Sequence, residues 1–270
     1  MKMRKLDYYK VAEYLITGIQ KYFKAANFTK AVIGLSGGLD SAVTAALTML
    51  ALEPKNVKLV FMPSEVTSQL SGNCAGEFYV KNGGDFIVKN IRHVLRAVTE
   101  KIELDPNSIA HQNLQARVRG MFLMTIANLE NRLVMETGNK SEDMVGYCTL
   151  YGDTVGAIAP IGDLYKTEVY ELAKHLNNNF RITIPESIIT RKPTAELTTN
   201  QFDEIELLPY PILDKILYVM EVTDDTPKMI ARSAGTSVDN VNKIIALYKR
   251  SEFKRKQLPP VIKLTKVCIG

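Results

Sequence analysis

Residues 31–43 read AVIGLSGGLDSAV and indicate the architecture of the chain most directly. The first five of these residues are almost all apolar, which predicts a buried strand at residues 31–35. Two adjacent glycines follow, and a helical pattern begins near Ala42. Paired glycines let the backbone turn sharply and approach a ligand closely. The stretch therefore predicts a strand, a tight loop and a helix in direct succession.

A loop of this kind is suited to binding phosphate. The N-terminus of the helix presents unpaired N–H groups and the positive end of the helix dipole, and Ser36 and Ser41 add hydroxyl donors. Asp40 has the same sign of charge as phosphate, so it fits such a site if a divalent cation lies between them. The loop matches neither GxxxxGK[ST] nor GxGxxG. A plain Gly-Gly turn with Asp40 or Ser41 as the helix N-cap is the alternative interpretation.

Strand-like and helix-like segments alternate along the first half of the chain. Further strands are predicted at residues 57–62, 85–88 and 133–136, and helix-length segments at residues 7–26, 41–52, 71–82 and 91–131. This alternation predicts an α/β fold in which a doubly wound parallel sheet of about five strands has helices on both faces. Helical patterns after residue 208, including residues 238–251, predict a C-terminal helical extension.

Composition and charge exclude several classes of protein. The chain has 270 residues, a net charge of +5 and no apolar run long enough to span a membrane. Its basic residues are not concentrated as in nucleic-acid binders, and a modest positive excess suits anionic small molecules such as nucleotides. The N-terminus lacks the apolar stretch of a signal peptide, and the three cysteines form no disulfide or zinc pattern. We therefore expect a cytoplasmic protein without nucleic-acid or membrane partners.

Two further segments are candidates for a binding cleft. Arg117 and Arg119 flank the apolar stripe of a helix on opposite edges, where each arginine either reaches a cleft or extends to water. Residues 195–208 lie between prolines and are rich in Thr, Asn, Asp and Glu. Long loops of this type often act as lids, so we expect residues 195–208 to form a mobile lid.

The string SGGLDS at residues 36–41 resembles the signature of the ATP pyrophosphatase superfamily, whose members split ATP into AMP and pyrophosphate. Other segments resemble the NAD synthetase family within it, over about residues 7–260. These are NLQARVR at residues 113–119, TGNKSE at 137–142, LYGD at 150–153, KTEVY at 166–170, KPTAEL at 192–197 and FKRKQLP at 253–259. The resemblance implies a Rossmann-like ATP pyrophosphatase fold and a single synthetase domain over residues 1–270.

The resemblance also implies roles for particular residues. The implied ATP-binding residues are Gly34, Leu35, Ser36, Gly37, Gly38, Leu39, Asp40, Ser41, Thr137, Lys166 and Thr194. Asp40 and Glu142 would hold Mg²⁺, and Lys166 would stabilise charge as the α–β phosphate bond breaks. Arg117, Asp153, Phe253 and Lys254 would bind deamido-NAD, with Asp153 orienting ammonia. The catalytic set is thus Asp40, Lys166 and Asp153.

Each of these side chains also has an ordinary structural interpretation when it is taken alone. Glu142 is then a first-turn helix acid, Thr137 and Thr194 are turn or cap residues, Lys166 and Lys254 are solvated lysines, and Asp153 is a turn aspartate. The chain departs from the family pattern at Glu136, where glycine is common, and at Leu150, where some relatives have a substrate-contacting lysine. Residues 72–76, read GNCAG, depart from it as well.

The implied activity is ATP-dependent amidation of deamido-NAD through an acyl-adenylate. Because the phosphate loop begins at residue 36, we expect no glutaminase domain of the kind that glutamine-using relatives carry, and free ammonia is the expected nitrogen donor. A separate glutaminase subunit stays open, and the family implies a homodimer. The alternatives are another amidating synthetase of the ATP pyrophosphatase type, or a nucleotide-binding regulator without catalysis.

Overall fold

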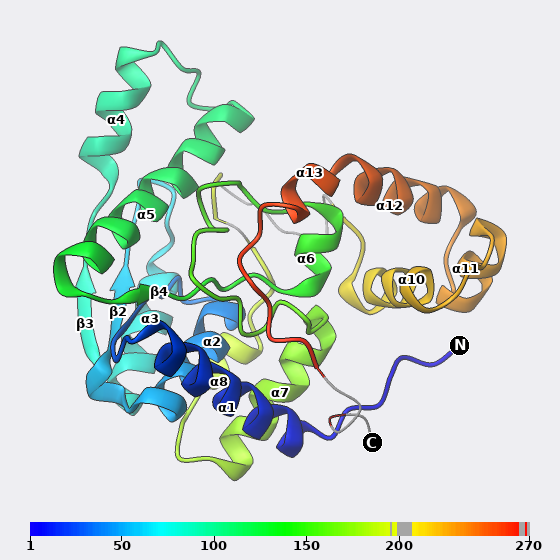
Figure 1. Ribbon diagram of the computed structural model, residues 1–270. Helices are drawn as coiled ribbons and strands as arrows, with labels where there is room; N and C mark the ends of the chain where they lie inside the picture. Colours follow the sequence, from blue (N-terminus) through cyan, green and yellow to red (C-terminus); the bar gives the residue numbers. More distant parts are fainter. Residues whose placement is uncertain (195, 199–206, 265–267, 269–270) are drawn as a thin grey trace.

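A parallel sheet of four strands lies at the centre of the part of the chain described by the computed structural model, residues 1–194, 196–198, 207–264 and 268 (Figure 1). Their order in the sheet is β3-β2-β1-β4. The strands are β1 (Ala31–Gly34), β2 (Val57–Phe61), β3 (Asp85–Val88) and β4 (Leu133–Val134). The chain therefore moves outward from β1 to β3 and then returns to the other side of β1, which makes the sheet doubly wound.

Helices cover both faces of the sheet. One face carries α1 (Tyr8–Ala26), α2 (Leu39–Leu52), α3 (Gln69–Asn82) and α7 (Lys166–Asn179), and the other carries α4 (Arg92–Lys101) and α5 (Ile109–Glu130). Successive side chains of a strand point to opposite faces of the sheet, which explains why two layers of helices pack on it. Ile33 packs in the core beneath α1, α2 and α7, whereas its neighbour Val32 packs in the core beneath α5.

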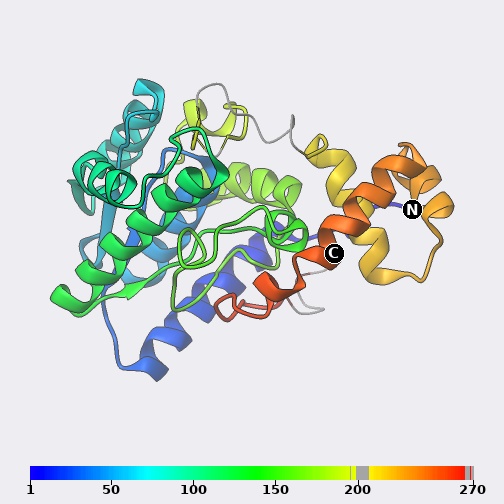
Figure 2. The ribbon, with the colours of Figure 1, turned by 90° about the horizontal axis from the view of Figure 1, so that it is seen from above.

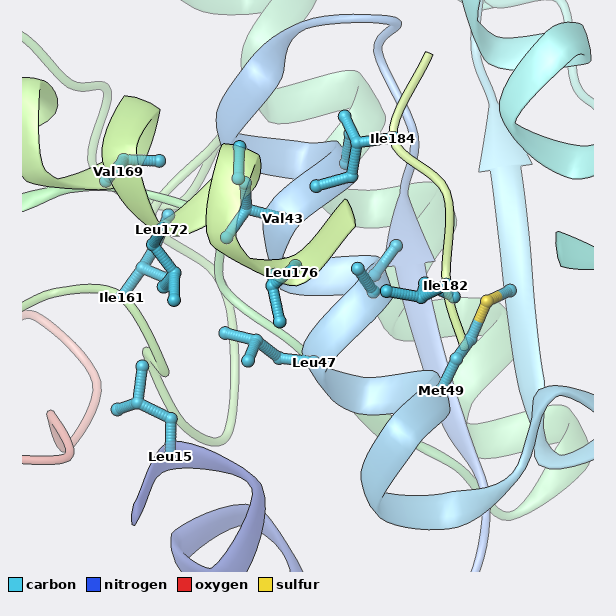
Figure 3. Close-up of a cluster of buried hydrophobic side chains, with 14 of the residues drawn as sticks. Leu15, Val43, Leu47, Met49, Ile161, Val169, Leu172, Leu176, Ile182 and Ile184 are labelled. Atoms are coloured by element: carbon cyan, nitrogen blue, oxygen red, sulfur yellow. The ribbon is translucent and has the colours of Figure 1, made fainter. Parts of the chain in front are cut away.

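The larger core lies between the sheet and α1, α2 and α7. Figure 3 shows Leu15 of α1, Leu47 of α2 and Leu176 of α7 among its side chains, and all three are completely buried. Burying a leucine side chain stabilises a fold by roughly 1.5–3 kcal/mol. This core therefore holds α2, and with it the loop that precedes α2, against the sheet.

A separate helical group follows the sheet region and projects from it (Figure 2). It consists of α10 (Tyr210–Val222), α11 (Pro227–Ala234), α12 (Val238–Arg250) and the short α13 (Glu252–Arg255). The first three of these helices pack around their own core, which includes Leu213, Leu217, Ile230 and Ile244. The other elements are η1 (Pro54–Asn56), α6 (Lys140–Val145) and α8 (Glu186–Ile189). The group confirms the expected C-terminal helical extension.

The doubly wound α/β architecture is confirmed, with differences at some boundaries. The described residues form four strands where about five were expected, and parallel bridges at Met135–Ile158 and Ala159–Val261 continue the sheet edge without a fifth regular strand. Residues 91–131 form two helices separated at residues 102–108. No described helix is both long and apolar enough to cross a bilayer. Most of the expected lid, residues 195–208, lies outside the described residues.

Candidate nucleotide-binding site

The loop between β1 and α2 has the geometry of an anion cradle. Gly37 has φ +83°, and a Cβ there would lie 2.3 Å from the carbonyl oxygen of Ser71, so only glycine fits. The Ser41 hydroxyl donates to the carbonyl of Gly38 at 2.9 Å and accepts from the N–H of Ser36 at 3.2 Å. No described side chain caps α2 at Gly38, so the first N–H groups of α2 face the loop without a side-chain partner.

The loops after β1 and β4 meet at the carboxyl edge of the sheet, on the two sides of the point where the strand order reverses. Asp40 follows β1, and Asn139 and Glu142 follow β4. The side-chain amide of Asn139 donates to Oδ1 of Asp40 at 3.2 Å, while its own oxygen accepts from the N–H of Glu142 at 3.1 Å. Asn139 therefore caps α6 and joins the two loops. Ligands of open α/β sheets bind at such reversal points.

Lys166, at the start of α7, lies between the carboxylates of Asp40 and Glu142. Its Nζ donates to Oδ2 of Asp40 and to Oε1 of Glu142, the latter at 3.2 Å. The Lys166 side chain is only 4% exposed, whereas the carboxylates are 19% and 18% exposed. Tyr210 of α10 adds a hydroxyl that donates to Oε1 of Glu142 at 3.2 Å. Asp40, Glu142 and Tyr210, from three separate segments of the chain, thus surround the ammonium group of Lys166.

The buried acid Asp214 fixes the backbone around Lys166 through hydrogen bonds to its neighbours. Asp214 of α10 accepts from the Ser141 hydroxyl at 2.5 Å and from the N–H of Thr167 at 2.8 Å. Ser141 in turn accepts from the N–H of Lys166 at 2.8 Å. Burial raises the pKa of Asp214 to about 6, against the lowering effect of these hydrogen bonds. The helical group therefore contributes directly to the position of Lys166.

A cavity of about 590 Å³ opens in front of these groups. Its size suits a small-molecule ligand. Of the residues expected at the site, the cavity wall contains Gly34, Leu35, Ser36, Gly38, Leu39, Asp40, Thr137, Glu142, Asp153, Lys166, Thr194 and Lys254. Gly37 and Ser41 lie behind the wall and shape the loop.

Arg117 and Phe253 are not brought into this wall. The Arg117 side chain is exposed and its Nε donates to the carbonyl of Leu150 at 3.2 Å, and Phe253 is 57% exposed. Arg119 lies on the cavity wall instead and donates to the carbonyl of Met62 at 3.0 Å. Burial lowers the pKa of Arg119 to about 10, with Glu196 and Asp153 acting in the opposite direction. The helical spacing predicted that both arginines lie at the edge of the apolar stripe. It did not predict which of them reaches the cavity and which extends to water.

Asp153 and Lys254 both lie on the cavity wall, although they are far apart in the sequence. Oδ1 of Asp153 accepts from the N–H of Thr149 at 2.7 Å, which holds a turn, and Lys254 donates to the carbonyls of Gly146 and Cys148 at 2.7 and 2.6 Å. Asp153 is accessible from the cavity, yet the surrounding protein raises its pKa through desolvation.

A connected group of polar side chains at the mouth of the cavity was not expected from the sequence. Glu196 accepts from the hydroxyls of Ser68 and Ser71, both at 2.6 Å, and pairs with Arg191 at 2.5 Å. Arg191 also donates to the Ser71 hydroxyl at 2.7 Å. These contacts fasten the described end of the lid segment to the N-terminus of α3, beside Gly37. The motif KPTAEL marked the segment but not its partners.

A second pair of acids, Glu136 and Asp143, is buried behind the cavity wall, with 2% and 7% exposure. Burial, followed by the neighbouring Asp143 carboxylate, raises the pKa of Glu136 well above its ordinary value. Burial and then Asp153 raise the pKa of Asp143 to about 7. Asp153, which lines the cavity, is thus near both members of the pair.

The donor set at the loop junction fits a hard divalent cation. Asp40 and Glu142 are acidic, face the same point and sit beside an uncapped helix N-terminus, where phosphate oxygens would complete an oxygen shell. No group of three or more His, Cys, Asp or Glu among the described residues could hold a metal by itself. A cation here would therefore depend on the phosphates as well as on the protein.

A doubly wound parallel sheet, a glycine-rich loop at its reversal point and a charged cavity in front of it define a nucleotide-binding α/β protein of the ATP pyrophosphatase type. The NAD synthase family model matches residues 11–258. The chain is 40% identical over 260 residues to a glutamine-dependent NAD(+) synthetase of Synechocystis sp., covering 95% of this chain and 46% of that protein. The chain belongs to the NAD synthase family.

Solved structures support the same assignment. An NH3-dependent NAD synthetase from Campylobacter jejuni superposes with a TM-score of 0.75 at 28% identity, covering 94% of this chain and 98% of that one. NMN synthetase from Francisella tularensis gives a TM-score of 0.80 at 26% identity, covering 93% and 97%. The chain spans about half the length of the curated relatives, since it covers 46% of the Synechocystis protein and 45% of a Thermotoga maritima relative with the same description.

Proposed function

We propose that this chain amidates deamido-NAD, using ATP and ammonia, and releases NAD, AMP and pyrophosphate. The observation that carries the proposal is the position of Lys166 between Asp40 and Glu142, next to the uncapped N-terminus of α2. Two acids, one cation and a row of free N–H groups supply what a polyphosphate with a divalent cation needs. Membership of the NAD synthase family supports the choice of substrate.

The first step transfers AMP to the substrate. A carboxylate oxygen of deamido-NAD attacks the α-phosphorus of ATP, the bond from that phosphorus to the bridging oxygen breaks, and pyrophosphate leaves. The loop at residues 34–41 holds the phosphates through its backbone N–H groups, and Thr137 and Thr194 contact ATP from the cavity wall. Lys166 neutralises charge on the departing pyrophosphate. Asp40 and Glu142 would hold Mg²⁺, which would neutralise charge on the phosphates.

The second step forms the amide. Ammonia attacks the acyl carbon of the adenylate, the C–O bond to AMP breaks, and the nitrogen loses one proton. Asp153 orients the nitrogen, and Lys254, which also lines the cavity, binds the substrate. No protein nucleophile is needed, so positioning and electrostatic stabilisation account for catalysis.

The positions of Arg117 and Phe253 support a homodimer. Both were expected to bind deamido-NAD, yet both are exposed on the isolated chain. The outer face of α5 also exposes Met121, Met124 and Leu129, at 50%, 44% and 81%. A helix that is apolar on both faces is normally covered on both. We propose that a second copy covers this face and completes the dinucleotide site near Arg117.

Ammonia is proposed as the nitrogen donor, supported by the resemblance to the NH3-dependent structure over nearly the full length of both chains. The curated relatives are described as glutamine-dependent, and this chain covers about half of them. Nitrogen delivered by a glutaminase is therefore the alternative. NMN synthetase is among the similar structures, so nicotinate mononucleotide is the second candidate acid.

One assay tests the proposal. Purified protein is incubated with ATP, Mg²⁺ and either deamido-NAD or nicotinate mononucleotide, with ammonium chloride or glutamine, and AMP, ADP, pyrophosphate and amide are quantified. We expect AMP and NAD in equal amounts from deamido-NAD with ammonium. Cleavage to ADP and orthophosphate would overturn the proposal, as would ATP binding without AMP formation. Turnover of another acid alone would reassign the substrate.

A further inference from the structure

Arg119 carries a positive charge on the cavity wall that the steps above do not use. Its Nε donates to the carbonyl of Met62 at 3.0 Å, whereas Nη1 and Nη2 have no hydrogen-bond or ion-pair partner among the described residues. Burial lowers the pKa of Arg119 to about 10, so the guanidinium stays protonated at neutral pH although it is partly removed from water. Such charges are normally paired, so the remaining N–H donors of Arg119 indicate a missing acceptor.

The described residues supply no counter-ion for Arg119. Burial is the largest influence on its pKa, and Glu196 and Asp153 oppose that influence without contacting the guanidinium. Both acids are bonded elsewhere, because Glu196 pairs with Arg191 and Asp153 accepts from the N–H of Thr149. The acceptor must therefore belong to a ligand, and an anionic acceptor is the kind that offsets a guanidinium.

Two neighbours place Arg119 at the beginning of the phosphate loop. Leu123 lies one turn after Arg119 on the same face of α5, and Met62 is the carbonyl partner of Arg119. A Cβ on Gly34, the first residue of the loop, would lie 3.3 Å from Cδ1 of Leu123 and 3.3 Å from Cε of Met62. Asp153, which is proposed to orient the nitrogen, is close enough that it and Arg119 shift each other's pKa. Arg119 is therefore near both the phosphates and the nitrogen.

One group of the two substrates must be near both the loop and Asp153. The α-phosphate belongs to the polyphosphate that the loop holds, and its phosphorus becomes bonded to the acyl group that the nitrogen attacks. The substrate carboxylate is the other anion that fits a guanidinium fork, but it loses its charge when the adenylate forms. The α-phosphate stays anionic through both steps, so it is the better partner for a permanent cation.

We infer that Arg119 is a further catalytic residue, whose Nη1 and Nη2 donate to the non-bridging oxygens of the ATP α-phosphate and then of the same phosphate in the acyl-adenylate. The inference rests on the proposed amidation. In the first step the guanidinium offsets charge on these oxygens while the carboxylate oxygen bonds to phosphorus and pyrophosphate leaves. In the second step it stabilises AMP, which takes up the electron pair of the breaking C–O bond.

The test compares pairs of ligands that differ in one charged group. Dissociation constants of AMP and adenosine, and of deamido-NAD and NAD, are measured by calorimetric titration on the wild type, Arg119→Gln and Arg119→Lys. Arg92→Gln is the matched control. Arg92 also donates to a backbone carbonyl just after β2, that of Ser64 at 3.4 Å, but it is exposed and away from the cavity wall. Exchange of labelled pyrophosphate into ATP, with deamido-NAD and without ammonia, measures the first step alone.

We expect the wild type to bind AMP more tightly than adenosine, and Arg119→Gln to reduce this preference roughly ten- to a hundredfold, as for a lost hydrogen bond to a charged group. The ratio of the dissociation constants of deamido-NAD and NAD should not change. Arg119→Lys should lose part of the AMP preference, because one ammonium group cannot reproduce the guanidinium fork. Pyrophosphate exchange should fall by about a hundredfold or more in Arg119→Gln. Arg92→Gln should match the wild type in every measurement.

An AMP preference that is absent from the wild type, or that survives in Arg119→Gln, would overturn the inference. Loss of the deamido-NAD preference in its place would assign Arg119 to the substrate carboxylate. If Arg119→Gln does not fold, Arg119→Lys decides, and an AMP preference equal to that of the wild type overturns the inference. If the wild type makes no amide but its AMP preference depends on Arg119, the proposed function fails and the phosphate contact stands. If amide forms and the AMP preference does not depend on Arg119, the inference fails alone.

Discussion

The Nζ of Lys166 lies 3.2 Å from Oε1 of Glu142, although the residues belong to different helices and Lys166 is almost fully buried. Asp40 accepts from the same Nζ. In this state the lysine neutralises two acids that would otherwise repel each other. We expect a bound cation to give the two acids a second positive partner, which would leave the Lys166 ammonium available to phosphate oxygens.

Asp40→Asn and Glu142→Gln should each reduce turnover by about tenfold or more, because a neutral amide places a divalent cation poorly. Steady-state rates of AMP release at saturating substrates measure the effect, and ATP affinity is measured with and without Mg²⁺. Glu171→Gln is the control, since Glu171 is a 53% exposed acid on the helix that carries Lys166. Rates near wild type for both site variants would rule out the proposed cation site.

Gly37→Ala should weaken ATP binding strongly and lower stability. The left-handed backbone costs an alanine about 1–2 kcal/mol, and its Cβ would also clash with the carbonyl of Ser71. Gly76→Ala is the matched control in α3, where a Cβ meets nothing within 4 Å. It should stabilise the protein by about 0.5–1 kcal/mol. Calorimetric titration and urea unfolding separate the effects, and wild-type ATP affinity in Gly37→Ala would contradict the loop geometry.

Glu196→Gln should loosen the segment at residues 191–198 from α3. The change removes the charge that accepts from Ser68, Ser71 and Arg191, and such bonds contribute about 1.5–3 kcal/mol each when the partner is charged. We expect faster limited proteolysis near this segment without nucleotide and a several-fold higher KM for ATP. The control is Glu77→Gln. Glu77 also accepts from a serine hydroxyl, that of Ser187, at 2.8 Å. Identical cleavage patterns in wild type and Glu196→Gln would show that the Glu196 contacts do not hold this segment against α3.

The pKa of Asp214, raised by burial to about 6, makes stability depend on pH in a definite direction. Between about pH 4 and 6 the folded protein keeps a proton on Asp214 that the unfolded chain has lost. The contribution of Asp214 to the free energy of unfolding is therefore fully present at low pH and is lost as the pH rises through 6. The slope is about 1.4 kcal/mol per pH unit at most. Asp214→Asn should flatten this part of the curve, measured by urea unfolding at several pH values. If the free energies of unfolding of wild type and Asp214→Asn differ by the same amount at every pH in this range, the raised pKa of Asp214 is contradicted.

Leu129→Glu should dissociate the proposed homodimer, because it places a charge on the exposed apolar face of α5. Light scattering after gel filtration should show a monomer at concentrations where the wild type is a dimer, with reduced affinity for deamido-NAD. Val80→Glu on α3 is the control, since Val80 is 80% exposed on a different helix. A monomeric wild type that is fully active would refute the dimer.

The strands, the phosphate loop and most of the site residues were accessible from sequence because each depends on local order. Apolar runs predicted β1, β2 and β3 to within a residue or two at either end, and the SGGLDS string marked the loop itself. β4 proved shorter than its apolar run, because after Val134 the chain pairs with Ile158 only through an isolated bridge. The pattern also could not predict that Arg119 and not Arg117 lines the cavity, since both lie at the edge of the same apolar helical stripe.

The order of residues along the chain shows which chemical groups are available. It contains adjacent glycines that let the backbone turn sharply, acids and a lysine in recognisable strings, and an alternation of elements that predicts a parallel sheet. Tertiary structure alone decided which of these groups meet. Asp40 and Lys166 are separated by 126 positions and Glu196 and Ser71 by 125, and nothing in their local patterns records the other partner. Helical and strand periods report which face of an element is apolar, whereas contacts between distant polar side chains arise only when the apolar faces pack and bring those elements together.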